Sequence, residues 1–234
     1  MAKESIAVPG YLPSVRNQIN PFLQEIKRKL SVECDRTCHW SKPVQRLEEL
    51  VRRDSIVRMG VLEMLHQVPK EHAYVSSLSE LLMALELISS RAPEYNPDPT
   101  RADFFPVSTL FVYMMMTPAG QEVFRIGDFN DCIRGILKSW CMYLDSPQSR
   151  DVLNTDENGW LSPSSWIRNN LDDYLIPDRS APHWGFNSFN DFFHRQIRPA
   201  CRPVDEPTNC KVIVSANDGT LYRALRDVKR MDRF

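Results

Sequence analysis

The chain has 234 residues, which is room for one large domain or two small ones. Hydrophobic residues make up 42% and charged residues 25%, which excludes a wholly disordered chain. The net charge is −1, with 29 Lys and Arg against 30 Asp and Glu, so a surface built to bind nucleic acid is excluded as well. With 8 Gly and 17 Pro, the composition disfavours glycine-rich phosphate loops and an all-β fold.

The ends of the chain and its cysteines indicate a cytoplasmic protein. Residues Met1–Gly10 lack the apolar core of a secretory signal, and the apolar run at 104–116 is too short for a transmembrane segment. The six cysteines are therefore expected to be free thiols. Cys34, Cys38 and His39 have the spacing of half a zinc site, but no second pair of ligands follows, so we expect no bound metal.

The first three quarters of the sequence predicts helices separated by Pro and by capping residues. Ser41, with Pro43 just inside the start, predicts a helix that continues toward Leu65. Ser77 and Glu80 form a capping box, and the apolar run at 104–116 predicts a helix in the centre of a bundle. Further helices are expected to begin at Thr117, Asp128, Ser146, Pro163 and Ser188.

The C-terminal quarter predicts a change to β structure. Lys211–Ser215 is the first clear strand pattern, Asp218 and Gly219 form a turn, and Leu221–Val228 is predicted to return as a second strand. We therefore expect an α+β fold with a helical domain at 1–177 and the opening strands of an incomplete β-rich domain at 178–234. A two-stranded ribbon is marginally stable alone, so self-association through its free edge is also expected.

Three segments, in order, resemble the phosphatidylserine decarboxylase family. Gly185–Arg195 (GFNSFNDFFHR) resembles its serine-capped helix with the Phe-Phe-x-Arg signature, and Ile197–Val204 (IRPACRPV) resembles the Arg-Pro continuation. Ser215–Gly219 (SANDG) resembles the Ser-Pro-x-Asp-Gly strand end, with Ala216 in place of the family's Pro. The helical part is similar to the N-terminal domain of fungal members, which include L-tryptophan decarboxylases.

This resemblance implies decarboxylation without pyridoxal phosphate. In the family, a serine in a Gly-Ser motif attacks its own backbone carbonyl, and cleavage of the chain leaves a pyruvoyl group. That group forms a Schiff base with the substrate amine and accepts electrons while carbon dioxide leaves. The resemblance assigns Asp218 as the catalytic carboxylate that orients the family's activating His. From the pattern alone, the first residue of a hairpin turn is the preferred interpretation of Asp218.

The sequence leaves the enzymatic role of this chain open. None of its eight glycines is followed by a serine, so the resemblance implies a truncated chain that is inactive alone. The alternative is a non-catalytic helical interaction or regulatory module. The resemblance implies an amine or phospholipid substrate, and the lack of a membrane anchor or presequence favours an amino acid such as L-tryptophan. Phe192, Phe193 and Arg195 could contact a lipid, but a packed helix end is the preferred interpretation.

Overall fold

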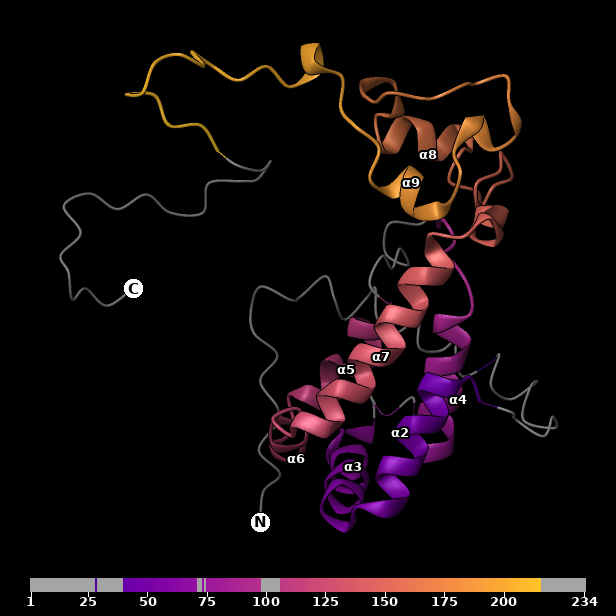
Figure 1. Cartoon of the computed structure of the whole chain (residues 1–234), viewed down its shortest axis with the longest axis vertical. Helices are drawn as coiled ribbons and strands as arrows, with labels where there is room; N and C mark the ends of the chain where they lie inside the picture. The colour runs from indigo at the N-terminus through magenta and orange to yellow at the C-terminus, as the bar shows by residue number, and fades with distance from the viewer. Residues whose placement is uncertain (1–27, 29–39, 71–72, 74, 98–105, 216–234) are drawn as a thin grey trace. The chain divides into compact units, whose positions relative to one another are not determined.

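The computed structural model describes residues 28, 40–70, 73, 75–97 and 106–215, and these residues form helices joined by short turns (Figure 1). The α-helices are α2 (Lys42–Arg53), α3 (Ser55–Gln67), α4 (Leu78–Ser89), α5 (Pro106–Met115), α6 (Pro118–Val123), α7 (Gly127–Leu144), α8 (Pro163–Arg168) and α9 (Phe189–Phe193). Four 3-10 helices are η2 (Pro147–Val152), η3 (Leu171–Asp173), η4 (Pro182–Gly185) and η5 (Pro199–Cys201).

Hydroxyl side chains start several of these helices, as the sequence predicts. Ser77 Oγ accepts the Glu80 N–H at 3.2 Å, and the Glu80 carboxylate accepts the N–H of Ser76 at 2.7 Å. Thr117 Oγ1 caps α6 through the N–H of Gly120 at 2.9 Å. These bonds satisfy backbone donors that have no partner within the helix, so the capping predictions at both positions are confirmed.

The helix predicted from Ser41 toward Leu65 is two helices, and this prediction was wrong. Asp54 separates α2 from α3, because its carboxylate accepts the N–H groups of Ile56 at 2.8 Å and Val57 at 3.1 Å and so begins a new helix. Ser41 makes no side-chain cap; its hydroxyl instead donates to the Glu86 carboxylate of α4 at 2.7 Å. The local capping bonds of Asp54 thus end one helix and begin the next, although the apolar pattern of the sequence continues across this position.

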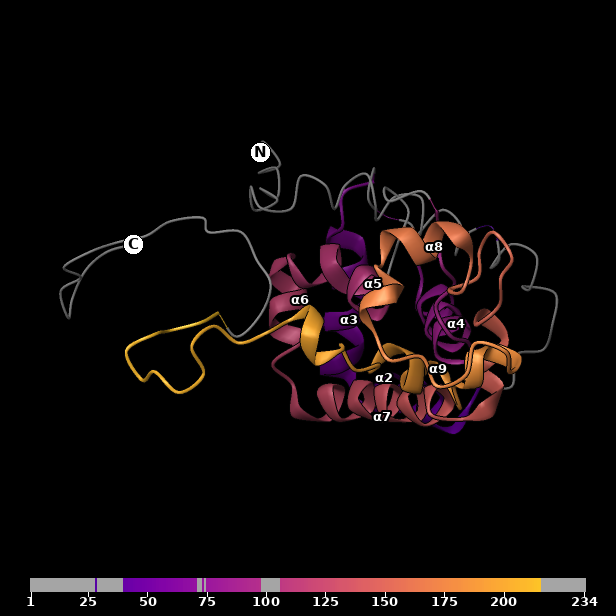
Figure 2. The same ribbon diagram turned by 90° about the horizontal axis from the view of Figure 1, so that it is seen from above.

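The first hydrophobic core holds α2 to α7 together. α2 packs on α7, α3 packs on α6, and α4 contacts α2, α5 and α7, as the two ribbon views also show (Figures 1 and 2). α4 and α5 are apolar on most sides, since they lie within this core. The largest fully buried side chains of this core are Phe129, Leu47, Met64, Leu81, Leu85 and Ile136.

A second core forms where α8, α9, η2, η3 and η4 meet the C-terminal end of α7. Trp160 lies in its middle, with ring contacts to Tyr95 at 5.5 Å, Phe189 at 5.9 Å and Phe192 at 5.8 Å between ring centroids. The indole N–H of Trp160 donates to the Pro93 carbonyl at 2.7 Å. The other buried side chains are Ala92, Leu144, Leu153, Leu161, Leu171 and Phe186.

The α+β prediction is wrong, because the described residues form no β-sheet. The predicted strand at Lys211–Ser215 is a turn followed by irregular backbone. Ile213 is 94% exposed and Val214 46%, so the strand buries no apolar face that would offset the entropy of ordering it. The second predicted strand and Asp218 lie outside the described residues, and self-association through a strand edge stays a prediction.

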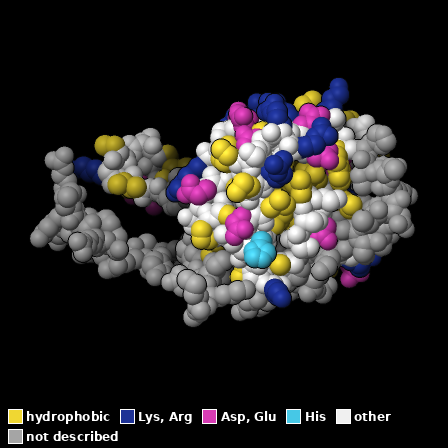
Figure 3. Space-filling model, turned by 90° about the horizontal axis from the view of Figure 1, so that it is seen from below, with side chains coloured by type: hydrophobic (Ala, Val, Ile, Leu, Met, Phe, Trp, Pro, Cys, Tyr) yellow, Lys and Arg dark blue, Asp and Glu magenta, His cyan; other side chains and the backbone are white. Residues whose placement is uncertain are grey.

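The described residues divide into two units, one running to Gln196 and the other beginning at Ile197. The first contains both cores, and the domain boundary near Pro177 stays a prediction. Figure 3 views the end of the first unit where α3 and α6 lie, and apolar side chains gather there among charged ones. Ile56, Met59 and Leu62 of α3 are exposed. Within the described ranges, no helix has both the length and the apolar character needed to cross a bilayer.

Candidate functional site

The family-like segment is Gly185–Arg195, the stretch that resembles the serine-capped helix of the family. Its side chains Phe186, Phe189 and Phe192 pack into the second core. All three side chains are buried, while Phe193 is 46% exposed and stacks on Phe189 at 6.0 Å between ring centroids. Ser188 starts α9 by accepting the N–H of Asp191 at 3.0 Å, as its position in the sequence predicts. The Phe-Phe signature therefore anchors the segment to the helical unit through Phe192 rather than forming an exposed apolar patch.

Arg195 closes the same short helix. Its guanidinium lies 4.3 Å from the ring centroid of Tyr174 and 4.5 Å from that of Phe192, and Nη1 donates to the Phe192 carbonyl at 3.0 Å. Burial lowers the pKa of Arg195 from its ordinary value, because the charged form loses hydration. The packed helix end is confirmed, and α9 ends at Phe193.

A strained turn precedes this helix. His183, Trp184 and Gly185 have φ angles of 53°, 52° and 80°, three successive residues in the left-handed region. His183 Nδ1 lies 2.8 Å from the carbonyl oxygen of Leu153, which ties the turn to the second core. A Cβ at Gly185 would lie 3.0 Å from the backbone nitrogen of Asp178, so glycine suits this position both by conformation and by space. The turn thereby fixes the direction in which the Phe186–Phe192 segment enters the core.

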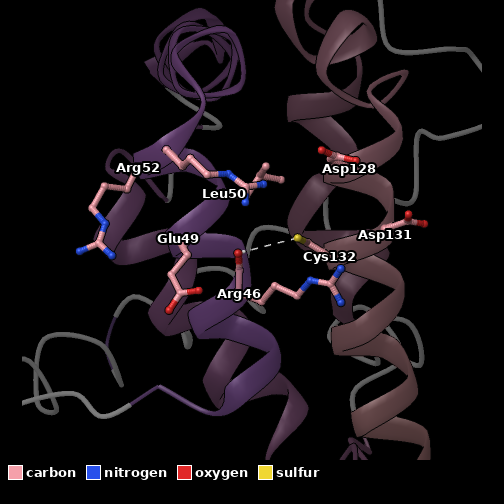
Figure 4. Close-up of a pocket in the computed structure, with 8 residues that line it drawn as sticks. Arg46, Glu49, Leu50, Arg52, Asp128, Asp131 and Cys132 are labelled. Atoms are coloured by element: carbon pink, nitrogen blue, oxygen red, sulfur yellow. Dashed lines mark hydrogen bonds between the residues drawn. The ribbon is translucent and has the colours of Figure 1, made fainter.

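A pocket of about 540 Å³ lies between α2 and α7, away from the family-like segment (Figure 4). The thiol of Cys132 contacts the carbonyl oxygen of Arg46 at 3.9 Å and so joins the two helices at its floor. Arg46 extends toward α7, whereas Glu49 and Arg52 point away from it (Figure 4). The pocket is lined by Arg46, Glu49, Leu50, Arg52, Arg53, Asp128, Asp131 and Cys132. The sequence analysis missed this site, because only the contact of α2 with α7 brings these residues together.

Cys132 is expected to react with iodoacetamide more slowly than Cys141. Burial raises the pKa of Cys132, and the nearby carboxylates of Asp128 and Asp131 add to the rise, so less reactive thiolate is present at any given pH. Cys141 is exposed. Peptide mass spectrometry after timed alkylation at pH 8 measures both rates. Equal rates in the folded protein and unequal rates in urea would contradict the expected protection.

The assigned catalytic Asp218 lies outside the described residues, as do Cys34, Cys38 and His39. Among the residues that are described, no three His, Cys, Asp or Glu side chains are grouped to hold a metal ion. A pyruvoyl group of the family kind requires a serine preceded by glycine, and these 234 residues contain no such pair. The residues present therefore do not fit a self-made pyruvoyl group.

Comparison with known proteins identifies the family of the chain. The family model described as phosphatidylserine decarboxylase matches residues 41–168, more than half of the chain, and this range contains the α2–α7 core and Trp160. The chain belongs to the phosphatidylserine decarboxylase family. The resemblance given by the 185–219 segments is thus confirmed by a different part of the sequence.

Three curated fungal relatives align with the chain. A decarboxylase of Amanita muscaria is 35% identical over 55% of this chain and 39% of its own length. L-tryptophan decarboxylases of Psilocybe cubensis and Psilocybe cyanescens are 26% and 25% identical, over 82% and 95% of this chain and 45% and 53% of their own lengths. The chain therefore spans about half the length, or less, of these relatives.

Proposed function

We propose that this chain is the helical part of a decarboxylase that removes carbon dioxide from an amine-bearing substrate. The observation that carries the proposal is the second core, in which Phe189 and Phe192 of the family-like segment contact Trp160, a residue of the family-matched range, and Phe186 packs on Phe192. The helical unit would hold the start of the decarboxylase part in place. The pyruvoyl chemistry of the family is assigned to residues other than these 234.

An aromatic amino acid such as L-tryptophan is the favoured substrate, and phosphatidylserine is the alternative. The relatives described as L-tryptophan decarboxylases align with 82% and 95% of the chain. The phosphatidylserine decarboxylase proenzyme of Chlamydia pneumoniae is 33% identical, but over only 32% of the chain and 26% of its own length. The preference rests on this difference in coverage.

A second candidate function is that of a non-catalytic interaction or regulatory module. It is favoured by one specific observation, the lack of any Gly-Ser pair in a chain whose helical unit has a well-filled core of its own. Such a module would act through its surface and would need no substrate.

The 234-residue chain alone is expected to stay intact and to release no carbon dioxide. Intact-mass spectrometry should give one species of 27.2 kDa, and carboxyl-labelled L-tryptophan and phosphatidylserine should both keep their label. Self-cleavage, or a carbonyl group trapped on the chain by hydroxylamine, would contradict the assignment of the pyruvoyl chemistry to other residues.

The decisive experiment expresses the whole reading frame of the transcript that encodes these residues. Release of labelled carbon dioxide from L-tryptophan would support the proposal. Release only from phosphatidylserine would reverse the substrate preference, and release from neither, by a folded product, would favour the non-catalytic module.

A further inference from the structure

The pocket between α2 and α7 has no role in the function proposed above. It belongs to the first core's surface, while the family-like segment packs in the second core. Its volume of about 540 Å³ lies in the range of sites that hold small molecules. Leu50 and Cys132 are buried and supply an apolar floor, and charged side chains surround it. The composition of this lining defines the kind of ligand that fits.

The basic side chains of the pocket come from α2. Arg46 and Arg53 are seven residues apart, which is about two helical turns or roughly 10 Å along the same face. Within the described part of the chain, neither guanidinium has a carboxylate partner within 4.0 Å. Both are exposed to the pocket and to solvent, and both are available to a carboxylate brought by a ligand.

The acidic side chain that lies toward them comes from α7. Asp128 lies in the first turn of α7, on the side toward α2, and makes no ion pair with another described residue (Figure 4). Asp131, one turn further along, pairs with Arg134. The same charged side chains act on the Cys132 thiol. Besides burial, which raises its pKa most, Arg46 and Arg53 lower the pKa while Asp128 and Asp131 raise it.

The lining is balanced in charge, and the division in space is between Arg46 and Arg53 of α2 and Asp128 of α7, since Glu49 lies on α2 and points away from α7 (Figure 4). Three arginines and three carboxylates line the pocket, so neither a simple anion nor a simple cation is favoured overall. A ligand that carries both charges can meet both sets at once. The smallest such group in metabolism is the ammonium and carboxylate pair of an α-amino acid.

We propose that this pocket binds an α-amino acid group, with its carboxylate held by Arg46 and Arg53 and its ammonium by Asp128. The side chain of the ligand would lie against Leu50 and Cys132. The group is found in a free amino acid and in the head group of phosphatidylserine. The choice of these two ligands rests on the proposed function, whereas the charge requirement rests on the pocket alone.

Isothermal titration calorimetry of the 234-residue chain tests the charge requirement with three probes. L-tryptophan carries both charges, tryptamine lacks the carboxylate, and indole-3-propionate lacks the ammonium. We expect L-tryptophan to bind and each single-charge analogue to bind at least about tenfold more weakly, since a charge-assisted hydrogen bond is lost. Equal binding of tryptamine and L-tryptophan, or no binding of any probe, would overturn the proposal.

Matched variants locate the site. Arg46→Gln, Arg53→Gln and Asp128→Asn should each weaken L-tryptophan binding about tenfold, while Lys138→Gln, an exposed change on α7 outside the pocket, should leave it unchanged. Circular dichroism melts check that each variant is folded. Binding that survives all three pocket variants would place the ligand elsewhere and overturn the assignment.

Sedimentation with vesicles distinguishes the two sources of the group. If the chain pellets with phosphatidylserine vesicles but not with phosphatidylcholine vesicles, and Arg46→Gln abolishes the pelleting, the site binds the lipid head group. If the chain does not pellet but binds L-tryptophan in calorimetry, the site binds the free amino acid. None of these readouts depends on decarboxylation. If the protein from the whole reading frame is catalytically active but this binding is absent, only the inference about the pocket is overturned. If the binding is present but that protein releases no carbon dioxide, only the proposed function is overturned.

Discussion

A chain that ends at Pro177 is expected to unfold with lower stability and less cooperativity than one that ends at Gln196. The shorter chain lacks Phe186, Phe189 and Phe192, which lie at 3%, 4% and 1% exposure in the second core. Burying one such side chain stabilises a fold by about 1.5–3 kcal/mol, so the three together are comparable with the total stability of a domain, about 5–15 kcal/mol.

Urea unfolding followed by tryptophan fluorescence measures the difference. Trp160 reports the second core, whereas Trp140 packs between both cores and responds to either. The chain that ends at Gln196 is the control, since it keeps the whole of the first unit. Identical midpoints for the two chains would show that the helical unit does not depend on the family-like segment.

Trp160→Ala is expected to cost about 3–5 kcal/mol of unfolding free energy, a typical cost for removing a buried aromatic side chain. The variant loses edge-on and tilted ring contacts with Tyr95, Phe189 and Phe192, together with the hydrogen bond to the Pro93 carbonyl. The segment after α4 that holds Pro93 and Tyr95, and α9, would both lose the side chain on which they pack.

Trp166→Ala is the matched control. Trp166 is half-buried, contacts Trp184 at 5.1 Å between ring centroids and carries the Arg179 guanidinium over its ring. Because its surroundings are partly hydrated, its removal should cost clearly less than that of Trp160. Equal losses of stability in chemical denaturation would contradict the central place given to Trp160.

The helices were predictable because their signals are local. Three helix starts are each fixed within four residues of sequence, by Ser77 with Glu80, Thr117 with Pro118, and Ser188 with Asp191. The structure has all three caps. The break at Asp54 was missed, because the apolar pattern continues across it and only the bonds to Ile56 and Val57 reveal a second cap.

The β structure was predicted for an equally local reason and was wrong. Lys211–Ser215 has the β-branched apolar run of a strand, but a strand is stable only when another strand pairs with it and a core covers one face. Among the described residues, no strand pairs with this segment and no core covers it, and Ile213 is exposed. The pattern of a strand therefore did not suffice to form one.

The sequence by itself determined the helical character of the chain, the caps at Ser77, Thr117 and Ser188, and the family, since each depends on residue types at short, fixed spacing. Only the tertiary structure decided which of these residues meet. Arg46 and Asp128 are 82 positions apart in the printed sequence, and their meeting at one pocket depends on the packing of α2 on α7. The burial of Phe192, the first residue of the Phe-Phe signature, against Trp160 was decided in the same way, because hydrophobic burial is non-directional and its partners follow from the whole fold.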